Sequence, residues 1–160
     1  MTAQVTEQVT EQTTARTTAL DPAVRSALQA VSAAAKKGLG DPGLAELVVI
    51  RASQLNHCAF CLDMHLRIAR EAGVSEDRLQ LLNAWEEAGD LYTERERAAF
   101  ALTEAVTVLT EGFVPDEVYE EAARHFDATR LAYLLALIAA INNWNRVMVT
   151  RRIPAGSTRW

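Results

Sequence analysis

The sequence predicts an all-α fold, a single-domain helical bundle. Signals that start and stop helices recur from residue 21 onward, and no stretch shows the alternation of apolar and polar residues that is typical of strands. Hydrophobic residues make up 49% of the 160 residues, so a chain of this length can bury one core without disulfides or a structural metal. Only short turns separate the expected helices, and we therefore expect residues 21–160 to form one helical domain.

The helices are expected where capping residues and helix-ending glycines alternate. Side chains suited to cap a helix N-terminus occur at Asp21, Asp41, Ser75, Thr93 and Asp116. Proline follows the first two at the first helical position, and Thr93 with Glu96 fits a capping box. Gly73, Gly89 and Gly112 are suited to end helices. The expected helices cover 22–38, 42–56, 58–72, 76–88, 94–111, 116–126 and 128–150.

Residues 1–20 are expected to be a flexible tail outside this domain. The segment is repetitive, rich in Thr, Gln and Glu and poor in large apolar side chains, so it cannot offset the entropy lost on ordering. Val5 and Val9 are spaced for one weak helical face, which leaves open that packing onto a neighbouring subunit orders the segment. The tail lacks the basic start and apolar stretch of a secretory signal, so we expect a cytoplasmic protein.

Charge and hydropathy argue against two classes of partner. The formal net charge is −5 and no basic stripe would neutralise a run of phosphates, so nucleic acid is not an expected partner. The most apolar run, residues 131–141, is shorter than the roughly 20 residues that a membrane-spanning helix needs. We interpret this run as part of a buried helix and expect no membrane association.

The helix that contains this run also predicts assembly. Its sequence LAYLLALIAAI has no polar side, as in a helix buried all round, and a short chain has little with which to cover it. We therefore expect a homo-oligomer, although the central helix of a monomeric bundle would have the same pattern. Trp144, which asparagines flank, is expected to pack in the core, with an interface or the substrate approach as alternatives.

The two cysteines predict redox or metal chemistry. Cys58 and Cys61 are separated by two residues, so they cannot form the framework of a disulfide-stapled fold. At about 100° per residue, both sulfurs and His65 share the inward face of one helix. Asp63 and Arg67 lie on the opposite face, toward water. A thiol reacts as its thiolate, and the helix N-terminus, the second sulfur and the histidine all favour loss of its proton.

Glu46 is a candidate partner of His65. It lies in an expected helix whose residues are almost all apolar, where an unpaired carboxylate is costly. Desolvation is expected to raise its pKa, and a carboxylate with a pKa nearer neutrality exchanges protons with a histidine or with water. A solvated helix charge is the alternative interpretation. His57 and His125 are interpreted as capping or surface residues.

Zinc binding is the main alternative to redox chemistry, because the two cysteines, His65 and Glu46 would offer four ligands. A structural zinc site usually takes its ligands as two separated pairs, with the cysteines on a loop or turn. Here both cysteines are expected on one regular helix, which favours redox chemistry. We expect no metal and no other cofactor, since haem, flavin and nicotinamide motifs are not found in the sequence.

The spacing of these residues resembles a known family. Glu46, eleven residues, Cys58-Ala-Phe-Cys61, three residues and His65 together resemble the core motif of the AhpD-like alkylhydroperoxidases, within the wider carboxymuconolactone decarboxylase family. The segment NHCAFCLDMH is similar to that family's helix start, NNWNRV is similar to a recurrent ending, and the resemblance covers residues 41–150. Phe60 departs from the pattern, because some relatives carry a further histidine just before the second cysteine.

The resemblance implies a fold and a set of roles. The fold would be an all-helical bundle with the Cys pair on a helix of a central hairpin, commonly assembled as trimers or hexamers. Cys61 would be peroxidatic and Cys58 resolving or proton-donating. His65 and Glu46 would relay protons, and the reductant would be a dithiol, either a lipoyl group or a thioredoxin-like protein. The helix dipole alone would favour Cys58 as the nucleophile, whereas the resemblance assigns this role to Cys61. We follow the resemblance on this point.

The function expected from these observations is that of a thiol-dependent peroxidase, which reduces hydroperoxides through a Cys58/Cys61 dithiol–disulfide cycle. Neighbouring cysteines suit this cycle, because the thiol of one reacts with the sulfenic acid of the other before the sulfenic acid is oxidised further. A general thiol–disulfide oxidoreductase or a redox sensor is the first alternative, and a non-catalytic zinc-binding or assembly protein is the second. True decarboxylases of the family do not depend on such a pair, which argues against that activity.

Overall fold

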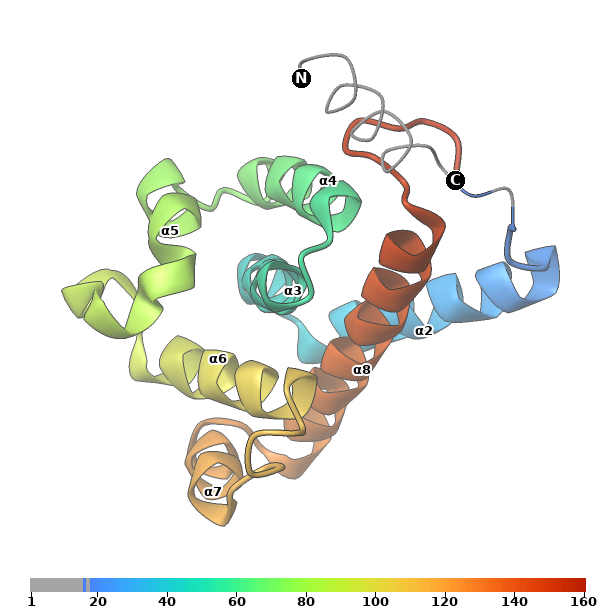
Figure 1. Cartoon of the computed structure of the whole chain (residues 1–160). Coiled ribbons are helices and arrows are strands. Elements are labelled where there is room, and N and C mark those ends of the chain that lie inside the picture. The colour runs from blue at the N-terminus through green and yellow to red at the C-terminus, as the bar shows by residue number, and fades with distance from the viewer. Residues whose placement is uncertain (1–15, 17) are drawn as a thin grey trace.

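A computed structural model describes residue 16 and residues 18–160, and these residues form helices and connecting segments without a strand. The α-helices are α2 (Pro22–Leu39), α3 (Pro42–Leu55), α4 (Ala59–Glu71), α5 (Glu76–Leu81), α6 (Glu94–Thr107), α7 (Asp116–His125) and α8 (Ala128–Arg151) (Figure 1). The short 3₁₀ helices η1 (Leu82–Glu87) and η2 (Gly89–Leu91) lie between α5 and α6. The all-α prediction is confirmed. The tail predicted over residues 1–20 falls almost wholly outside the described residues, and the division into tail and domain stays a prediction.

The predicted capping residues begin several of these helices. The Asp21 side chain accepts a backbone N–H of α2 at 2.8 Å, and the Asp41 side chain accepts one of α3 at 3.0 Å. Thr93 and Glu96 form the predicted capping box of α6. Gly40 ends α2 in the left-handed conformation, with φ of 71°, which glycine adopts without strain. Gly40 and Asp41 alone therefore join α2 to α3, so the end of α2 lies near the first turns of α3.

The helix predicted over 76–88 is interrupted. α5 is only six residues long, and the chain continues as η1 with a non-helical Ala84, whose φ is −126° and ψ 33°. Tertiary contacts account for the break, because they hold Trp85 in the core. The Trp85 ring packs edge-on against Phe100, and its Nε1 donates to Glu104 at 2.7 Å. These contacts join residues far apart in the sequence, so the local capping pattern could not indicate them and predicted an uninterrupted helix over 76–88.

The helix predicted over 94–111 also ends early. α6 stops at Thr107, and Gly112 lies in the following loop rather than at the helix end. Thr107 and Val108 are both β-branched, which weakens a helix at its last turn. Thr107 is buried, and its hydroxyl accepts a hydrogen bond from Asn142 Nδ2 of α8 at 2.9 Å. A contact with another helix therefore fixes the end of α6.

Helices α3 and α8 form the centre of the bundle. The 24-residue α8, orange to red in Figure 1, contacts α2, α3, α4, α6 and α7. Every residue of α3 from Leu44 to Ile50 is buried, so this helix is covered on nearly all sides. Helices of the same chain cover part of α8, but Ala132, Tyr133 and Ala139 of its apolar run are exposed. The homo-oligomer stays a prediction. None of the described helices has the length and apolar content needed to cross a membrane.

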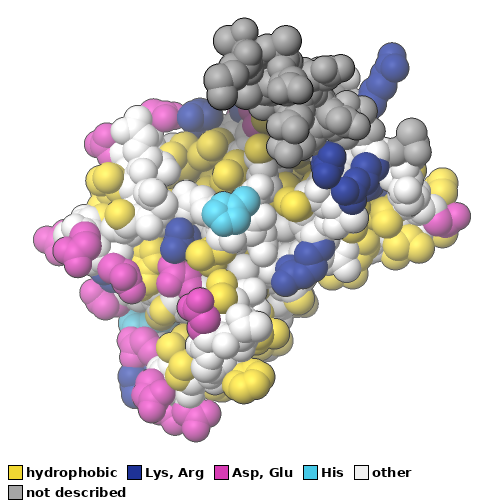
Figure 2. All heavy atoms as spheres, in the orientation of Figure 1, with side chains coloured by type: hydrophobic (Ala, Val, Ile, Leu, Met, Phe, Trp, Pro, Cys, Tyr) yellow, Lys and Arg dark blue, Asp and Glu magenta, His cyan; other side chains and the backbone are white. Residues whose placement is uncertain are grey.

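The acidic side chains are unevenly distributed on the surface. Figure 2 shows them gathered over the part of the molecule that α5, α6 and α7 form in this view. Exposed acids of these helices and their connections include Glu87, Asp90, Glu94, Asp116 and Glu117. A negative surface of this kind repels an anionic partner such as a phosphate backbone.

A buried polar network joins the end of α3 to α8. Asn145 Nδ2 donates to Ser53 Oγ at 2.9 Å. Asn56 Nδ2 donates to the side-chain oxygens of Asn142 and Asn145, each at 2.9 Å. Asn56 is the C-cap of α3 and precedes Cys58 by two residues. The network therefore fixes the turn from which the cysteine pair starts.

We predict that Asn145→Leu lowers the free energy of unfolding by about 1–3 kcal/mol, because it leaves the buried Ser53 hydroxyl and Asn56 amide one partner short. Asn143→Leu is the matched control, since Asn143 is exposed on the same helix. Its expected effect is within about 0.5 kcal/mol. Denaturant unfolding followed by circular dichroism measures both, and equal effects would contradict the role given to the network.

Candidate active site

A helical hairpin carries the cysteine motif. α3 and α4 pack against each other and are joined by residues 56–58. In this turn His57 has a positive φ of 53°, and the Cys58 N–H donates to the Ser53 carbonyl at 3.0 Å. The structure refines the predicted start of the helix, because Cys58 is the N-cap of α4 and Cys61 lies in its first turn. The two sulfurs thus stand at the beginning of a helix, with the first one just outside it.

Cys58 and Cys61 form a disulfide, and their Cα atoms lie 5.3 Å apart. Both residues are buried. The Cys58 Sγ also accepts the Cys61 N–H at 3.3 Å, so this sulfur caps the helix. The first turn of a helix has N–H groups without helical partners, and these favour a negative charge at the cap position. A thiolate on Cys58 would therefore be stabilised in the reduced protein.

His65 and Glu46 meet between the two helices of the hairpin. His65 follows Cys61 by one turn and lies on the same face of α4, where it is buried. Glu46, on α3, is only 3% exposed. The distance between His65 Nδ1 and Glu46 Oε2 is 2.8 Å, which is a hydrogen bond between two buried groups. The four residues predicted from the motif are therefore brought together in one place.

Lys36 is a further member of the cluster that the sequence did not indicate. Its Nζ donates to Oε1 of Glu46, the carboxylate oxygen that His65 does not use. Lys36 lies near the end of α2, and the two-residue turn before α3 brings it beside Glu46. Its side chain is 30% exposed, so it reaches the carboxylate from the edge of the cluster. No local pattern marks this lysine, because the pairing depends on how α2 and α3 turn.

The pKa of Glu46 lies below its ordinary value, which corrects the prediction that it is raised. Burial is the largest single influence and does raise the pKa, but the hydrogen bonds and charges of His65 and Lys36 together outweigh it. Glu46 is therefore a carboxylate at neutral pH. From its hydrogen bond we assign the His65 proton to Nδ1, which leaves Nε2 free as a base.

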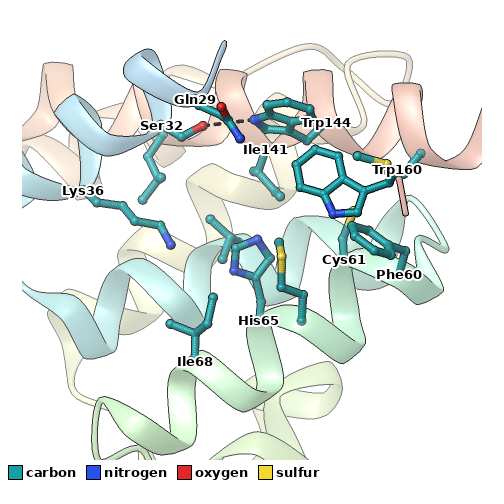
Figure 3. A pocket seen from close by; sticks show the side chains of 14 residues that line it. Gln29, Ser32, Lys36, Phe60, Cys61, His65, Ile68, Ile141, Trp144 and Trp160 are labelled. Atoms are coloured by element: carbon teal, nitrogen blue, oxygen red, sulfur yellow. Dashed lines mark hydrogen bonds between the residues drawn. The ribbon is translucent and has the colours of Figure 1, made fainter. Parts of the chain in front are cut away.

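A cavity of about 260 Å³ lies beside this cluster. Cys61, His65 and Lys36 line it, whereas Cys58 is not among the described residues that do. Figure 3 shows the Lys36 side chain extending toward His65 within the pocket. Most of the remaining wall is apolar, from residues that include Val49, Ile68, Leu137, Ile141 and Met148. The pocket therefore presents one cysteine sulfur, one imidazole and one lysine in a wall that is otherwise mostly apolar.

The sequence also drew attention to Trp144, His57 and His125, which lie outside the Glu46–His65 pair. Trp144 packs against the core as predicted and also lines the pocket, with its Nε1 donating to Ser32 Oγ at 3.1 Å. His57 is exposed, and His125 pairs with Glu121 at 2.9 Å. In residues 16 and 18–160, no three His, Cys, Asp or Glu side chains gather in an arrangement able to hold a metal ion.

Comparison with known proteins gives consistent matches. The sequence model of the carboxymuconolactone decarboxylase family matches residues 22–105. The chain is 43% identical over 112 residues to YdfG, an uncharacterized protein of Bacillus subtilis (strain 168), across 70% of this chain and 76% of that protein. It is 35% identical over 116 residues to YnjA, an uncharacterized protein of Escherichia coli (strain K12), across 72% of this chain and 62% of that protein.

A solved structure has a similar fold. It is the crystal structure of a protein of unknown function from Agrobacterium tumefaciens, described as a candidate antioxidant defence protein AhpD. The TM-score is 0.81 and the sequence identity 34%, and the match covers 86% of this chain and 93% of that one. The similarity therefore extends over both the fold and the sequence.

We predict that Lys36→Met raises the pKa of Glu46, because it removes a hydrogen bond and a positive charge while the burial of the carboxylate remains. Lys37→Met is the matched control, since it removes the same charge from the neighbouring, exposed position. A carboxyl-detected NMR titration measures the pKa in both variants. The same Glu46 pKa in wild type and Lys36→Met would show that the lysine does not act on this carboxylate.

The lowered pKa of Glu46 also predicts how stability depends on pH. A carboxyl group with a lower pKa in the folded state stabilises the fold above its unfolded pKa, and this stabilisation is lost as the pH falls through the folded pKa. Wild-type protein should therefore lose stability as the pH falls below the ordinary Glu value of 4.5, and Lys36→Met should lose less. Thermal unfolding over a pH series measures the difference, and parallel curves would contradict this expectation.

Proposed function

Because this chain belongs to the carboxymuconolactone decarboxylase family and has an AhpD-like fold, we propose that it is a thiol-dependent peroxidase that reduces hydroperoxides through a Cys58/Cys61 dithiol–disulfide cycle. The observation that carries the proposal is that Cys61 and His65 both line an apolar pocket while Glu46 is hydrogen-bonded to His65. A nucleophile, a base and a group that orients the base are the parts an activated thiol needs. The description of the Agrobacterium tumefaciens protein as a candidate antioxidant defence protein supports the same class.

Cys61 is the attacking sulfur in this proposal, since it lines the pocket together with His65. His65 Nε2 accepts the thiol proton, and Glu46 stabilises the imidazolium that results. The thiolate sulfur forms a bond to the distal oxygen of the hydroperoxide while the O–O bond breaks. His65 returns the proton to the departing alkoxide, so the products are an alcohol and a sulfenic acid on Cys61.

Cys58 then resolves the sulfenic acid. Its sulfur forms the S–S bond, the S–O bond of Cys61 breaks, and the hydroxide leaves as water with the Cys58 thiol proton. The N-cap position of Cys58 favours its thiolate, which is the form that attacks. Because the two residues are close enough to bond, the sulfenic acid is captured before a second peroxide over-oxidises it.

The reductant in this proposal is a dithiol, either a lipoyl group or a thioredoxin-like protein. Its thiolate attacks Cys61 from the pocket, the S–S bond breaks, and Cys58 leaves as a thiolate. A stabilised thiolate is the better leaving group, so the N-cap position of Cys58 supports this direction of attack. The second thiol of the reductant then attacks the mixed disulfide and releases Cys61. Two electrons pass from the dithiol to the peroxide in each cycle, without a further cofactor.

A homo-oligomer, as a trimer or hexamer, and a cytoplasmic location remain part of the proposal. Leu109 and Phe113, which are 49% and 76% exposed, lie in the loop between α6 and α7. Exposed apolar side chains that lie near each other support a contact between subunits. A disulfide that a dithiol must reopen in each cycle supports a reducing compartment.

Cys58→Ser is expected to accumulate a sulfenic acid on Cys61, because it keeps the attacking thiol and removes the resolving one. Brief exposure of the reduced variant to an organic hydroperoxide, followed by a sulfenic-acid probe and peptide mass spectrometry, locates the adduct. Cys61→Ser is the matched control and should give little adduct. An adduct on Cys58 alone would reverse the two roles. Absence of adduct in both variants would favour the general thiol–disulfide oxidoreductase or the redox sensor.

Glu46→Gln is expected to slow disulfide formation by hydroperoxide at least ~100-fold, the lower end of what general acid–base catalysis contributes. Glutamine keeps the size of the side chain but cannot stabilise an imidazolium by charge. Glu121→Gln is the matched control, because it alters a second Glu–His pair that lies outside the pocket on α7. Stopped-flow mixing of reduced protein with peroxide measures the rates, and a wild-type rate in Glu46→Gln would contradict the relay.

A further inference from the structure

Trp160 lines the pocket but takes no part in the proton relay. Its indole borders the same cavity as Cys61, and it is half-buried. Figure 3 shows Trp160 on the side of the pocket where Cys61 and Phe60 lie, opposite Lys36. No sequence motif marks this residue, and the thiol chemistry leaves it without a role. Its indole is nevertheless placed where it can contact a substrate that reaches Cys61.

Three helices hold the Trp160 ring in place. It packs edge-on against Trp144 of α8, with ring centroids 5.7 Å apart and planes at 88°. It also packs against Phe60 of α4, at 5.7 Å and 60°. From α2, the Arg25 guanidinium lies 4.0 Å from the ring centroid, a cation–π contact. The indole is therefore fixed by contacts on several sides rather than loosely placed at the surface.

The segment that leads to Trp160 is itself anchored on α4. Ile153, just after α8, is buried in a hydrophobic cluster with both cysteines and Phe60. Further along, the Gly156 N–H donates to the Asp63 carboxylate at 3.1 Å. These two attachments direct the chain across the start of α4, so that Trp160 closes the pocket on the side of Cys61.

From this arrangement we infer that Trp160 is a specificity-determining residue, whose indole forms the outer wall of the substrate pocket and selects hydroperoxides with an aromatic organic group. The inference rests on the proposed peroxidase function. The Trp160 ring meets the ring of Phe60 at a tilted angle and that of Trp144 edge-on, and a further flat ring packs favourably in the same geometries. Met64 and Met148 add polarisable sulfur atoms, which contact aromatic rings well.

The size of the pocket agrees with this substrate class. Its volume of 260 Å³ far exceeds the roughly 30 Å³ that one water occupies in the liquid, so hydrogen peroxide would leave most of the apolar wall uncovered. It also lies just below the usual range of small-molecule sites, about 300–1,000 Å³, which favours a small ligand. A small organic hydroperoxide with one ring therefore matches the pocket better than hydrogen peroxide or a long chain.

The kinetic test compares two hydroperoxides that differ by one ring. Cumene hydroperoxide carries a phenyl group where tert-butyl hydroperoxide has a methyl group. Single-turnover rate constants for disulfide formation in pre-reduced full chain give their ratio for wild type, Trp160→Ala and Trp160→Phe. Trp160→Ala is expected to lower the ratio about tenfold, the upper range for one aromatic contact, and Trp160→Phe to retain most of it. Tyr119→Ala, an exposed aromatic outside the pocket, should keep the wild-type ratio.

A binding test separates this inference from the peroxidase function. The alcohol 2-phenyl-2-propanol, the product from cumene hydroperoxide, is titrated into the same variants and its Kd is measured by NMR. Trp160→Ala should weaken binding about tenfold. If wild type reacts with neither hydroperoxide, the proposed function fails, and the Kd alone decides the role of Trp160. An unchanged rate ratio in a reactive protein overturns the inference. In a protein that reacts with neither hydroperoxide, the inference is overturned if Trp160→Ala binds the alcohol with the wild-type Kd, or if the wild type does not bind it.

Discussion

The carboxylate of Glu46, buried between Lys36 and His65, is the constraint on which the site depends. A charged group in the most enclosed helix of the bundle is costly unless partners from other elements compensate for the water it loses. Here one partner comes from α2 and the other from α4, so three helices must keep their relative places. The two-residue turn before α3 holds the first contact, and the turn at residues 56–58 holds the second.

The same arrangement separates the two sulfurs by role. Cys61 faces the cavity beside the base, while Cys58 occupies the helix cap, where backbone N–H groups favour a thiolate. One sulfur is therefore placed to meet a substrate and the other to attack or leave within the protein. The asparagine network around Asn56 supports this division, because it fixes the turn that precedes Cys58. The turn at residues 56–58 thus sets both the cap position of Cys58 and the place of Cys61 in the first turn of α4.

Features that depend on neighbouring residues were predictable from the sequence. Of the tertiary contacts at the site, the Glu46–His65 pair was indicated, by the spacing of the motif, whereas the contacts of Lys36 and Trp160 were not. The Asp-Pro caps and the spacing of Cys61 and His65 act within one helix, so the bundle and the shared face of α4 followed from local rules. Lys36 and Trp160 reach the site through turns whose geometry no local pattern encodes. The apolar neighbours of Glu46 predicted a raised pKa, whereas the two basic partners, one of them unforeseen, reverse the direction.

The most direct measurement is the second-order rate constant for oxidation of pre-reduced wild-type protein by an organic hydroperoxide, beside that of free cysteine at the same pH. If the buried pair activates Cys61, the protein should react about 10²–10⁴ times faster, the range that general acid–base catalysis supplies. A rate equal to that of free cysteine would contradict the central claim. The cysteine pair would then serve disulfide exchange or sensing rather than peroxide reduction.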